Sequence, residues 1–398
     1  MMDIEPTDAE AIDFVRTGPG TIGGRYLRRF WQPIYLSRDL AEGQAVPIRV
    51  MSEEFTLYRG ASGQPYVTVH RCPHRGTQLS TGWVRGEDLK CRYHGWEFDP
   101  TGQCTAQPAE PQPFCSKVKV ATYPAKEAIG FIFAYFGEGA PPPFPQWPRL
   151  GHFLHRHRID CNYFQSAENI VDDVHVHFSH YHNAVLRRSR RAYIPGVSAH
   201  ETSFGLTQEL RNARSTELNH FIMPNMCYLQ FDQRKIAMVS VLFAYVPIDD
   251  THHTHYMSIS ITTPLPRIIN RLVFGVAAWI HARMSVNRDE WFTRRTLEVL
   301  AGKTLFDRIG NPRLQDTVMC VGQGVIADRS AERLGRSDAA VVLLRKIWKR
   351  ELRLLAEGKP LTPFAFPRFV EASGEVAGAD LSEHVDVASA PGGDSVVP

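Results

Sequence analysis

The chain has 398 residues, of which 43% are hydrophobic and 22% are charged, and its formal net charge is +3. This balance is typical of a folded globular protein and excludes wholesale disorder, while so small a positive charge gives no argument for nucleic acid as a partner. The length suits two domains. The longest apolar run, Leu272 to Ile280, is about half of the roughly 20 residues that span a bilayer, so we expect no stable membrane association.

Residues 1–16 are acidic and show no secretory signal, so we expect a cytoplasmic protein. The seven cysteines are an odd number and are widely spread. In a reducing compartment this favours metal ligation over a disulfide framework.

The first part of the chain predicts a helix followed by short strands. Residues 22–36 read as a short amphipathic helix that Pro33 ends. Phe55–Tyr58 and Tyr66–Val69 flank a glycine turn and predict a hairpin. The apolar run 129–136 predicts a strand that is buried on both faces.

A proline-rich stretch, residues 140–148, predicts a stiff connector between two domains. Beyond it, residues 165–182 read as partly helical. Residues 201–262 read as long antiparallel strands with a turn at Asp249–Asp250.

Two further helices and a tail complete the predicted elements. Residues 268–283 read as a buried or pocket-covering helix rather than a membrane-surface helix. Residues 337–357 read as a strong amphipathic helix with Ser337 as its N-cap and Gly358 after its end. Residues 372–398 are rich in Gly, Ala, Ser, Asp and Val without periodicity, so we expect a disordered tail.

A first group of metal-ligand residues lies in two short motifs, C-x-H at Cys72 and His74 and C-x-x-H at Cys91 and His94. Each motif follows a predicted strand, so two loops can present two thiolates and two imidazoles to one centre. Such a set suits a structural zinc ion or a Rieske [2Fe–2S] cluster, in which two cysteines hold one iron and two histidines hold the other. The spacing favours the cluster, because each loop carries one ligand of each kind.

These loops resemble the Rieske domain of the oxygenase components of Rieske non-haem iron oxygenases. Rieske ferredoxins share such loops but would stop there. This chain continues to residue 398, so we expect a second function in the remainder.

A second group, Asp172, His175 and His180, follows in the predicted partly helical stretch. Two histidines and one carboxylate on one face of an iron leave positions open for dioxygen and substrate. Five residues of ideal helix turn through about 140°, so the helix must end or distort between the two histidines. Asp172 is predicted to accept a hydrogen bond from the ring nitrogen of His175 that does not hold iron. His177 and His182 have the same spacing, but no aspartate stands three residues before His177.

The resemblance to the oxygenases extends beyond these residues. The pattern shared with the family, with Tyr163 where tryptophan is usual, comprises Asn162, Tyr163, Gln165, Glu168, Asn169, Asp172, His175 and His180. It places Asn169 near the iron. It also implies a third iron ligand from an aspartate in a C-terminal helix. Asp316 is the favoured candidate, with Gln323 after it and Cys320 where glutamate is frequent in the family. Asp307 and Asp328 are its rivals.

The fold implied by the resemblance is α+β, with a small all-β Rieske domain and a helix-grip catalytic domain whose curved antiparallel sheet wraps a long helix. The expected division begins with an N-terminal helical segment, residues 1–37, that packs on the catalytic domain. The Rieske domain follows at residues 38–148, the catalytic domain at 149–371 and the tail at 372–398. Residues 23–33 resemble the phthalate-oxygenase-like branch, whose chains usually form homotrimers without a small β subunit. In such a ring, Asp172 would link His175 to His94 of the next chain.

The resemblance therefore implies the terminal oxygenase of a multicomponent system. It would use a [2Fe–2S] cluster, a mononuclear Fe(II) and O2, with electrons from NAD(P)H through a ferredoxin and/or a flavin reductase. We expect monooxygenation of a small aromatic substrate, by hydroxylation or oxidative O- or N-dealkylation. Aromatic cis-dihydroxylation is the alternative, and a Rieske electron-transfer protein without oxygenase activity is the alternative from another class.

Four side chains in the predicted strand 220–231 are candidates for a substrate pocket, namely Phe221, Met223, Met226 and Tyr228. A pocket for an aromatic ring needs a mostly apolar lining, which they would supply. Ordinary core packing explains the same pattern equally well.

Overall fold

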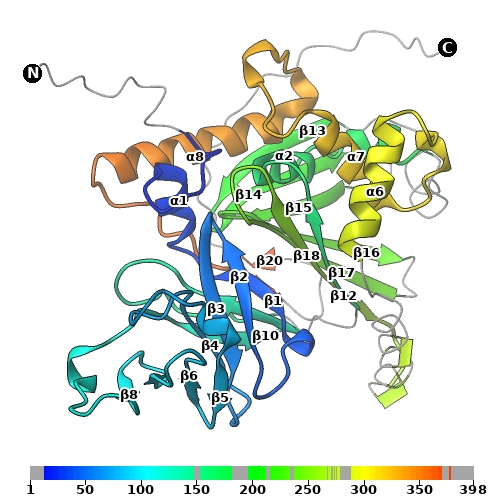
Figure 1. Cartoon of the computed structure of the whole chain (residues 1–398). Coiled ribbons are helices and arrows are strands. Elements are labelled where there is room, and N and C mark those ends of the chain that lie inside the picture. The colour runs from blue at the N-terminus through cyan, green and yellow to red at the C-terminus, as the bar shows by residue number, and fades with distance from the viewer. Residues whose placement is uncertain are drawn as a thin grey trace, which may run out of the picture.

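The computed structural model describes residues 13–147, 153–181, 196–211, 216–233, 237–266, 288–369 and 376–377, with positions 268, 269, 272, 274, 276 and 277. Figure 1 shows a lower half made of short strands and an upper half in which helices pack on a large sheet. None of the helices within these residues is long and apolar enough to cross a membrane.

The lower half consists of three small antiparallel sheets. One sheet has the strand order β2 (Ala45–Val50), β3 (Glu53–Arg59), β4 (Pro65–Val69) and β9 (Thr122–Tyr123). The next has the order β5 (Trp83–Arg85), β6 (Asp88–Lys90), β7 (Glu97–Phe98) and β8 (Cys104–Ala106). The third has the order β1 (Gln32–Leu36), β11 (Phe131–Ala134) and β10 (Ala125–Ala128). The predicted hairpin is thus β3–β4, and the predicted buried strand contains β11, whose four residues are all buried.

The structure corrects the helix predicted over residues 22–36. Only Ile22–Leu27 (α1) is helical, whereas Gln32–Leu36 forms β1 and pairs with β11. Pro33 has no backbone N–H to donate, so it is better tolerated in an edge strand than inside a helix. β1 is the edge of its sheet, and its register shifts next to Pro33.

The upper half contains a seven-stranded antiparallel sheet with the strand order β12-β18-β17-β16-β15-β14-β13. Its strands are β12 (Phe153–Ile159), β13 (Gly196–Thr202), β14 (Gly205–Arg211), β15 (Thr216–Ile222), β16 (Met226–Gln233), β17 (Ala237–Pro247) and β18 (His253–Thr262). The turn predicted at Asp249–Asp250 connects β17 to β18, where Asp249 accepts the backbone N–H of Thr251. The sheet and the small strands together confirm the predicted α+β fold class.

The helices of the upper half are α2 (Tyr163–Asn169), α3 (His175–Ser179), α6 (Arg288–Leu300), α7 (Pro312–Gly322) and α8 (Ala339–Ala356). The long helix α8 packs on β13 and β14. Its Trp348 is fully buried and lies 5.0 Å from the ring of Tyr26 in α1 and 5.5 Å from that of Phe164 in α2. The cap of α8 is Asp338 rather than the predicted Ser337, because residues 336–338 form a 3₁₀ turn before the helix.

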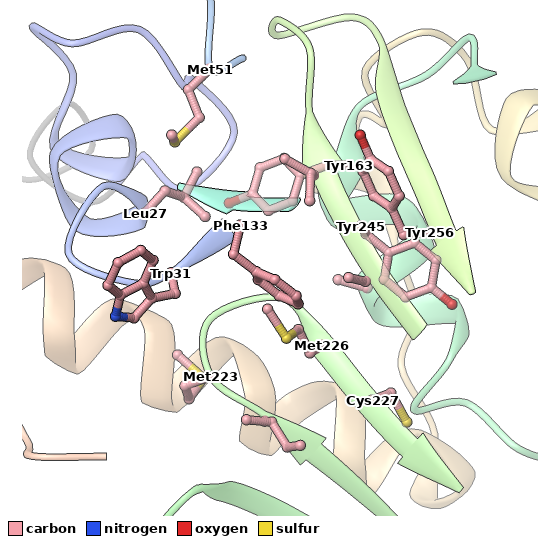
Figure 2. Packing of buried hydrophobic residues seen from close by; sticks show 14 of the residues in the cluster. Leu27, Trp31, Met51, Phe133, Tyr163, Met223, Met226, Cys227, Tyr245 and Tyr256 are labelled. Carbon is pink, nitrogen blue, oxygen red and sulfur yellow. The ribbon is translucent and has the colours of Figure 1, made fainter. Parts of the chain in front are cut away.

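The segment predicted as a connector is packed rather than free. Trp31 donates its ring N–H to the carbonyl of Pro142 at 2.9 Å, and Trp147 lies 4.7 Å from Phe133 and 4.4 Å from Phe366. One hydrophobic core runs through both halves of the chain, and Figure 2 shows side chains of α1, β11 and the large sheet meeting within it. A separate small core supports the second sheet of the lower half.

Two predicted segments fall largely outside the described residues. The helix expected at 268–283 is described only at six positions, which are helical. The expected tail lies outside the described residues apart from Val376–Ala377 (β20), which pairs with Arg368–Phe369 (β19).

Candidate metal centres

The two loops of the first group have the same local construction. In each loop a glycine four residues after the cysteine donates its N–H to the carbonyl of that cysteine, Gly76 to Cys72 at 2.8 Å and Gly95 to Cys91 at 2.9 Å. Both glycines have positive φ angles, +72° and +75°, which glycine adopts without steric cost. The two turns therefore present their cysteines in equivalent ways.

The four candidate ligands of these loops come together at one end of the lower half. Cys72 and Cys91 are both buried and interact with each other, and after burial this contact is among the causes that raise the pKa of Cys72 to about 11. The rings of His74 and His94 lie 4.4 Å apart. The Nδ1 atoms of both rings are buried without a hydrogen-bond partner.

These orphaned atoms are the observation that tests the fit of a [2Fe–2S] cluster. A buried ring nitrogen without a partner is costly, and ligation to iron removes that cost. Two buried thiols beside two such nitrogens provide the donor set of a Rieske cluster. Trp96 supports it, because its ring stacks on His74 at 4.5 Å and 3°.

The second group joins α3, which begins at His175 and is capped by His180, to the middle of α7, which carries Asp316. Nε2 of His175 lies 3.2 Å and Nε2 of His180 lies 3.0 Å from Oδ1 of Asp316. Two ligands bound at right angles with metal–ligand bonds of about 2.1 Å would be roughly 3 Å apart. Within the described part of the chain, no other group of three or more His, Cys, Asp or Glu residues brings its ligand atoms close enough together to hold a single ion.

Each histidine of this group is oriented through its other ring nitrogen. Nδ1 of His180 donates to the side-chain oxygen of Gln315 at 2.7 Å, and the amide nitrogen of Gln315 donates to the carbonyl of Ile309 at 2.8 Å. Nδ1 of His175 contacts the backbone carbonyl of Asp172. Such contacts fix the tautomer so that Nε2 is free to bind a metal.

The position of Asp172 differs from the prediction in one respect. The ring of His175 contacts its backbone carbonyl rather than its carboxylate. The carboxylate instead accepts the backbone N–H groups of His175 and Val174, at the start of α3. Burial raises the pKa of Asp172, while the neighbouring His175 lowers it.

Charge complementarity within the group is strong. Burial alone would raise the pKa of Asp316, but hydrogen bonds from His175 and His180 hold it well below its usual range. Against the opposing effect of burial, the carboxylate of Asp316 raises the pKa of His175 to about 8. The carboxylate of Asp316 thus stabilises positive charge on the neighbouring imidazoles. A bound divalent cation would supply that positive charge instead of the protons on the imidazoles.

The rival candidates lie elsewhere. Asp307 and Asp328 are exposed, and Asp328 accepts the backbone N–H of Ser330 at 2.9 Å. His182, the partner of His177 in the alternative pair, lies outside the described residues. The required break in the helix is present, because α3 ends at Ser179 and His180 has φ −100° and ψ 17°.

The other residues of the shared pattern hold α2 in place. Asn162 caps α2 and donates to the carbonyls of Val15 and Asp250. Gln165 donates to the carbonyls of Cys320 and Gly324, at 2.8 and 2.9 Å, and so ties α2 to α7.

Glu168 adds an ion pair to this support, with Arg329 at 2.7 Å and Arg345 as its partners. Asn169 is half-buried at the last turn of α2, just before the segment that leads to α3.

The four predicted pocket residues all lie in the main core, and Met226 and Tyr228 lie on the face of their strand that meets the lower half. Met226 pairs across the sheet with Ala244, which pairs with Tyr256, and the ring of Tyr256 meets that of Phe131 in the lower half. Met226 and Phe133, both labelled in Figure 2, belong to this same core. Tyr228 shares this face by alternation, so both point away from α7.

The opposite face of the same strands lies toward α7. Tyr245 and His255 are cross-strand partners, their rings stack at 5.0 Å, and Asp316 is near enough to affect the pKa of each. Cys227 and Phe243, also cross-strand partners, share this face. Of the predicted pocket residues, Phe221 is the cross-strand partner of Cys227 and shares this face, whereas Met226 and Tyr228 lie on the other one. Gln315 was missed altogether, although its place beside Asp316 was a usable signal.

Comparison with known proteins agrees with this geometry. Residues 30–124 match the Rieske [2Fe-2S] domain family. The chain is 29% identical to the 5,5'-dehydrodivanillate O-demethylase oxygenase subunit of a Sphingobium species, over 90% of this chain and 82% of the relative. It is also 29% identical to the phthalate 4,5-dioxygenase oxygenase subunit of Pseudomonas putida, over 84% of each chain.

Among solved structures, the oxygenase of carbazole 1,9a-dioxygenase in complex with its ferredoxin has the same fold. The TM-score is 0.59 at 18% identity, over 82% of this chain and 92% of the other. Together these matches confirm the resemblance inferred from the two loops.

Proposed function

Since this chain is an oxygenase component of the Rieske non-haem iron type, we propose that His175, His180 and Asp316 hold its mononuclear Fe(II). Cys72, His74, Cys91 and His94 would hold its [2Fe–2S] cluster. The observation that carries the proposal is the convergence of two imidazole nitrogens on one carboxylate oxygen at 3.2 and 3.0 Å. Two histidines and a carboxylate are the donor set of non-haem Fe(II) oxygenases.

When bound, the cluster supplies electrons one at a time, and the mononuclear iron supplies open coordination positions for O2 and substrate. The chain's own residues orient these groups. Gln315 and the carbonyl of Asp172 hold the two imidazoles in the metal-binding tautomer. The sheet face that carries Cys227, Phe243 and Tyr245 would offer a largely apolar surface to an aromatic substrate.

The separation of the two proposed centres supports a route for electrons between neighbouring chains. The loops between β4 and β7 and the site at α7 lie at opposite ends of the molecule in Figure 1. We therefore propose a homotrimer in which the cluster of one chain reaches the iron of the next, with Asp172 linking His175 to His94 of the neighbouring chain. A ferredoxin and/or a flavin reductase using NAD(P)H would reduce the cluster.

The reaction that we favour is monooxygenation of a small aromatic compound, by hydroxylation or oxidative O- or N-dealkylation. The similarity to an O-demethylase oxygenase subunit over most of both chains supports this choice. Aromatic cis-dihydroxylation is the alternative, supported by the equal identity to a phthalate 4,5-dioxygenase subunit.

Counting iron tests the two-centre proposal directly. We expect about three iron ions per chain in the purified protein and about two in the His180→Ala variant, which should keep the spectrum of a [2Fe–2S] cluster. An unmodified protein with only two would instead support an electron carrier without oxygenase activity. A colourless zinc protein would contradict the cluster itself.

Product analysis decides the reaction. The reduced enzyme is supplied with a methoxylated benzoic acid under 18-O-labelled dioxygen. O-Demethylation releases formaldehyde and leaves a phenol, with a single atom from O2 incorporated during the reaction. A cis-dihydrodiol that carries two labelled atoms would overturn the monooxygenation proposal in favour of its alternative.

A further inference from the structure

Two cysteines of the lower half are not needed for the cluster. Cys104 lies in β8 and is 3% exposed, and Cys115 begins a short 3₁₀ turn, Cys115–Lys117, where it is half-buried. Both are free thiols. They belong to the same small core that contains Cys72 and Cys91.

Backbone contacts place the turn that carries Cys115 directly against the strand that carries Cys104. The N–H of Cys104 donates to the carbonyl of Val118 at 3.0 Å. The side-chain amide of Gln103 donates to the carbonyl of Cys115 at 2.7 Å and to that of Val118 at 3.0 Å. These contacts fix the two cysteines as neighbours.

The thiols themselves interact. Burial raises the pKa of Cys104 to about 12, and the neighbouring thiol of Cys115 adds to the rise through a hydrogen bond and charge repulsion. Cys115 stands beside exposed neighbours, Phe114 and Ser116, so a small oxidant can reach it from solvent. A solvent-reachable thiol next to a buried one is the arrangement in which oxidation ends in a disulfide.

We propose that Cys104 and Cys115 are a modification site, at which hydrogen peroxide converts the two thiols into a reversible intramolecular disulfide. The thiol of Cys115 loses its proton, and the thiolate attacks peroxide. The O–O bond breaks, a sulfenic acid forms, and the departing hydroxide takes up that proton to give water. The thiol of Cys104 then attacks that sulfur, the S–S bond forms, and the S–O bond breaks with release of a second water. The two thiols lose two electrons and two protons, and one peroxide is reduced to two waters.

The disulfide would close the segment that covers one side of the proposed cluster. The ring of Phe114 meets that of Trp96 at 5.5 Å, and Trp96 stacks on His74. The N–H of Phe114 is held by the side chain of Gln107 at 2.6 Å, inside the same segment. The inference depends on the geometry of this half alone, not on the mononuclear iron.

The sequence makes the test simple, because Tyr93–Lys117 contains both cysteines and no internal lysine or arginine. Full-length, cluster-loaded protein is treated with stoichiometric hydrogen peroxide, alkylated with iodoacetamide and digested with trypsin. We expect this peptide to lose two hydrogens and take up no label. Chymotryptic cleavage after Phe114 should then give two fragments that separate only after reduction with dithiothreitol.

Controls come from the same chain. The Cys115→Ser variant should keep its cluster and fold and should lose the two-hydrogen mass change. The pair Cys161 and Cys320, also close but 0% and 1% exposed, should remain reduced under the same treatment. Alkylation of both Cys104 and Cys115 after peroxide treatment, or linkage of either one to another cysteine while the cluster absorption is intact, would overturn the proposal.

Discussion

Adjacent residues of α7 serve the proposed iron site in two different ways. Asp316 offers a carboxylate oxygen to both histidines, while Gln315 holds His180 through a hydrogen bond of 2.7 Å. The amide of Gln315 is itself fixed by the carbonyl of Ile309. Because Gln315 is 1% exposed, its orientation is determined by the protein rather than by solvent.

We expect Gln315→Leu to weaken binding of the mononuclear metal by roughly 10–100-fold, since partners that orient metal-bound imidazoles contribute about that much. Titration of the iron-depleted mononuclear site with Fe(II) or Co(II) measures the change. Gln323→Leu is the matched control, because Gln323 is exposed at the end of the same helix. Equal affinity in the two variants would contradict the role of Gln315.

We expect Asp172→Asn to leave both metals bound but to lower turnover by roughly 10–100-fold. The asparagine oxygen can still accept the N–H groups of Val174 and His175, so α3 should keep its start. The change removes the charge that would link His175 to a neighbouring chain. Product formation at the normal rate, with normal iron content, would show that the charge is not needed.

The residue types at the two centres were predictable because their spacing is local. C-x-H, C-x-x-H and the aspartate–histidine pattern are readable within short windows of sequence. The hydrogen bond between His180 and Gln315 joins residues 135 positions apart, so no local pattern contains it. The contact of the His175 ring with the backbone carbonyl of Asp172 was also not predictable, because every residue has a backbone carbonyl and the sequence does not mark which one is used.

At the level of elements, polar side chains tie α2 to its neighbours. Gln165 connects it to α7, and Glu168 connects it to Arg329 and to Arg345 of α8. Arg345 therefore supports α2 from α8. Since α2 leads directly into Asp172 and α3, these contacts help to position the proposed iron site.

Glu168→Gln should lower the free energy of unfolding by about 3 kcal/mol, because it leaves Arg329 without its carboxylate in a largely buried place and leaves Arg345 with Glu332 alone. The side chains of Glu168, Arg329 and Arg345 are 11%, 14% and 15% exposed. Chemical denaturation measures the loss. The control is Glu357→Gln, whose partner Lys359 is 62% exposed, and which should cost less than about 1 kcal/mol.

Elements were harder to predict where proline or strand alternation decides the outcome. The apolar residues near Pro33 fit a helix or a strand, and pairing with β11 selects the strand. On β16, Met226 and Cys227 are both apolar, and only the arrangement of the layers shows which of them faces α7. The antiparallel strands of residues 201–262 were readable from the sequence, whereas the face that each strand presents depends on the three-dimensional packing.

Across the whole molecule, several histidines are buried without charge. Burial, the largest cause for each, lowers the pKa of His220 and His253 to about 4 and that of His255 to about 3, and it lowers the pKa of His157 well below its ordinary value. In the unfolded chain the same groups titrate near 6.5. Each one therefore favours the unfolded state once the pH falls below that value.

The expected result is a stability that is fully present above about pH 6.5 and falls as the pH decreases from there toward about 4. Each of these groups contributes up to about 1.4 kcal/mol per pH unit within that window. Thermal unfolding of the iron-loaded protein between these pH values measures the effect. Replacing His220, whose ring contacts Thr207, with Gln should reduce the slope, and an unchanged slope would contradict the assignment.

The anchored stretch at residues 141–147 restricts how the two halves of the chain can behave. Phe144 and Trp147 sit among aromatic rings from both halves, so no hinge is available at this point. The cluster-bearing half cannot act as a swinging arm that carries reducing equivalents to α7 within its own chain. In the proposed homotrimer, electrons would instead pass between neighbouring chains, and dilution that dissociates the chains should abolish single-turnover reoxidation of the cluster while leaving each chain folded.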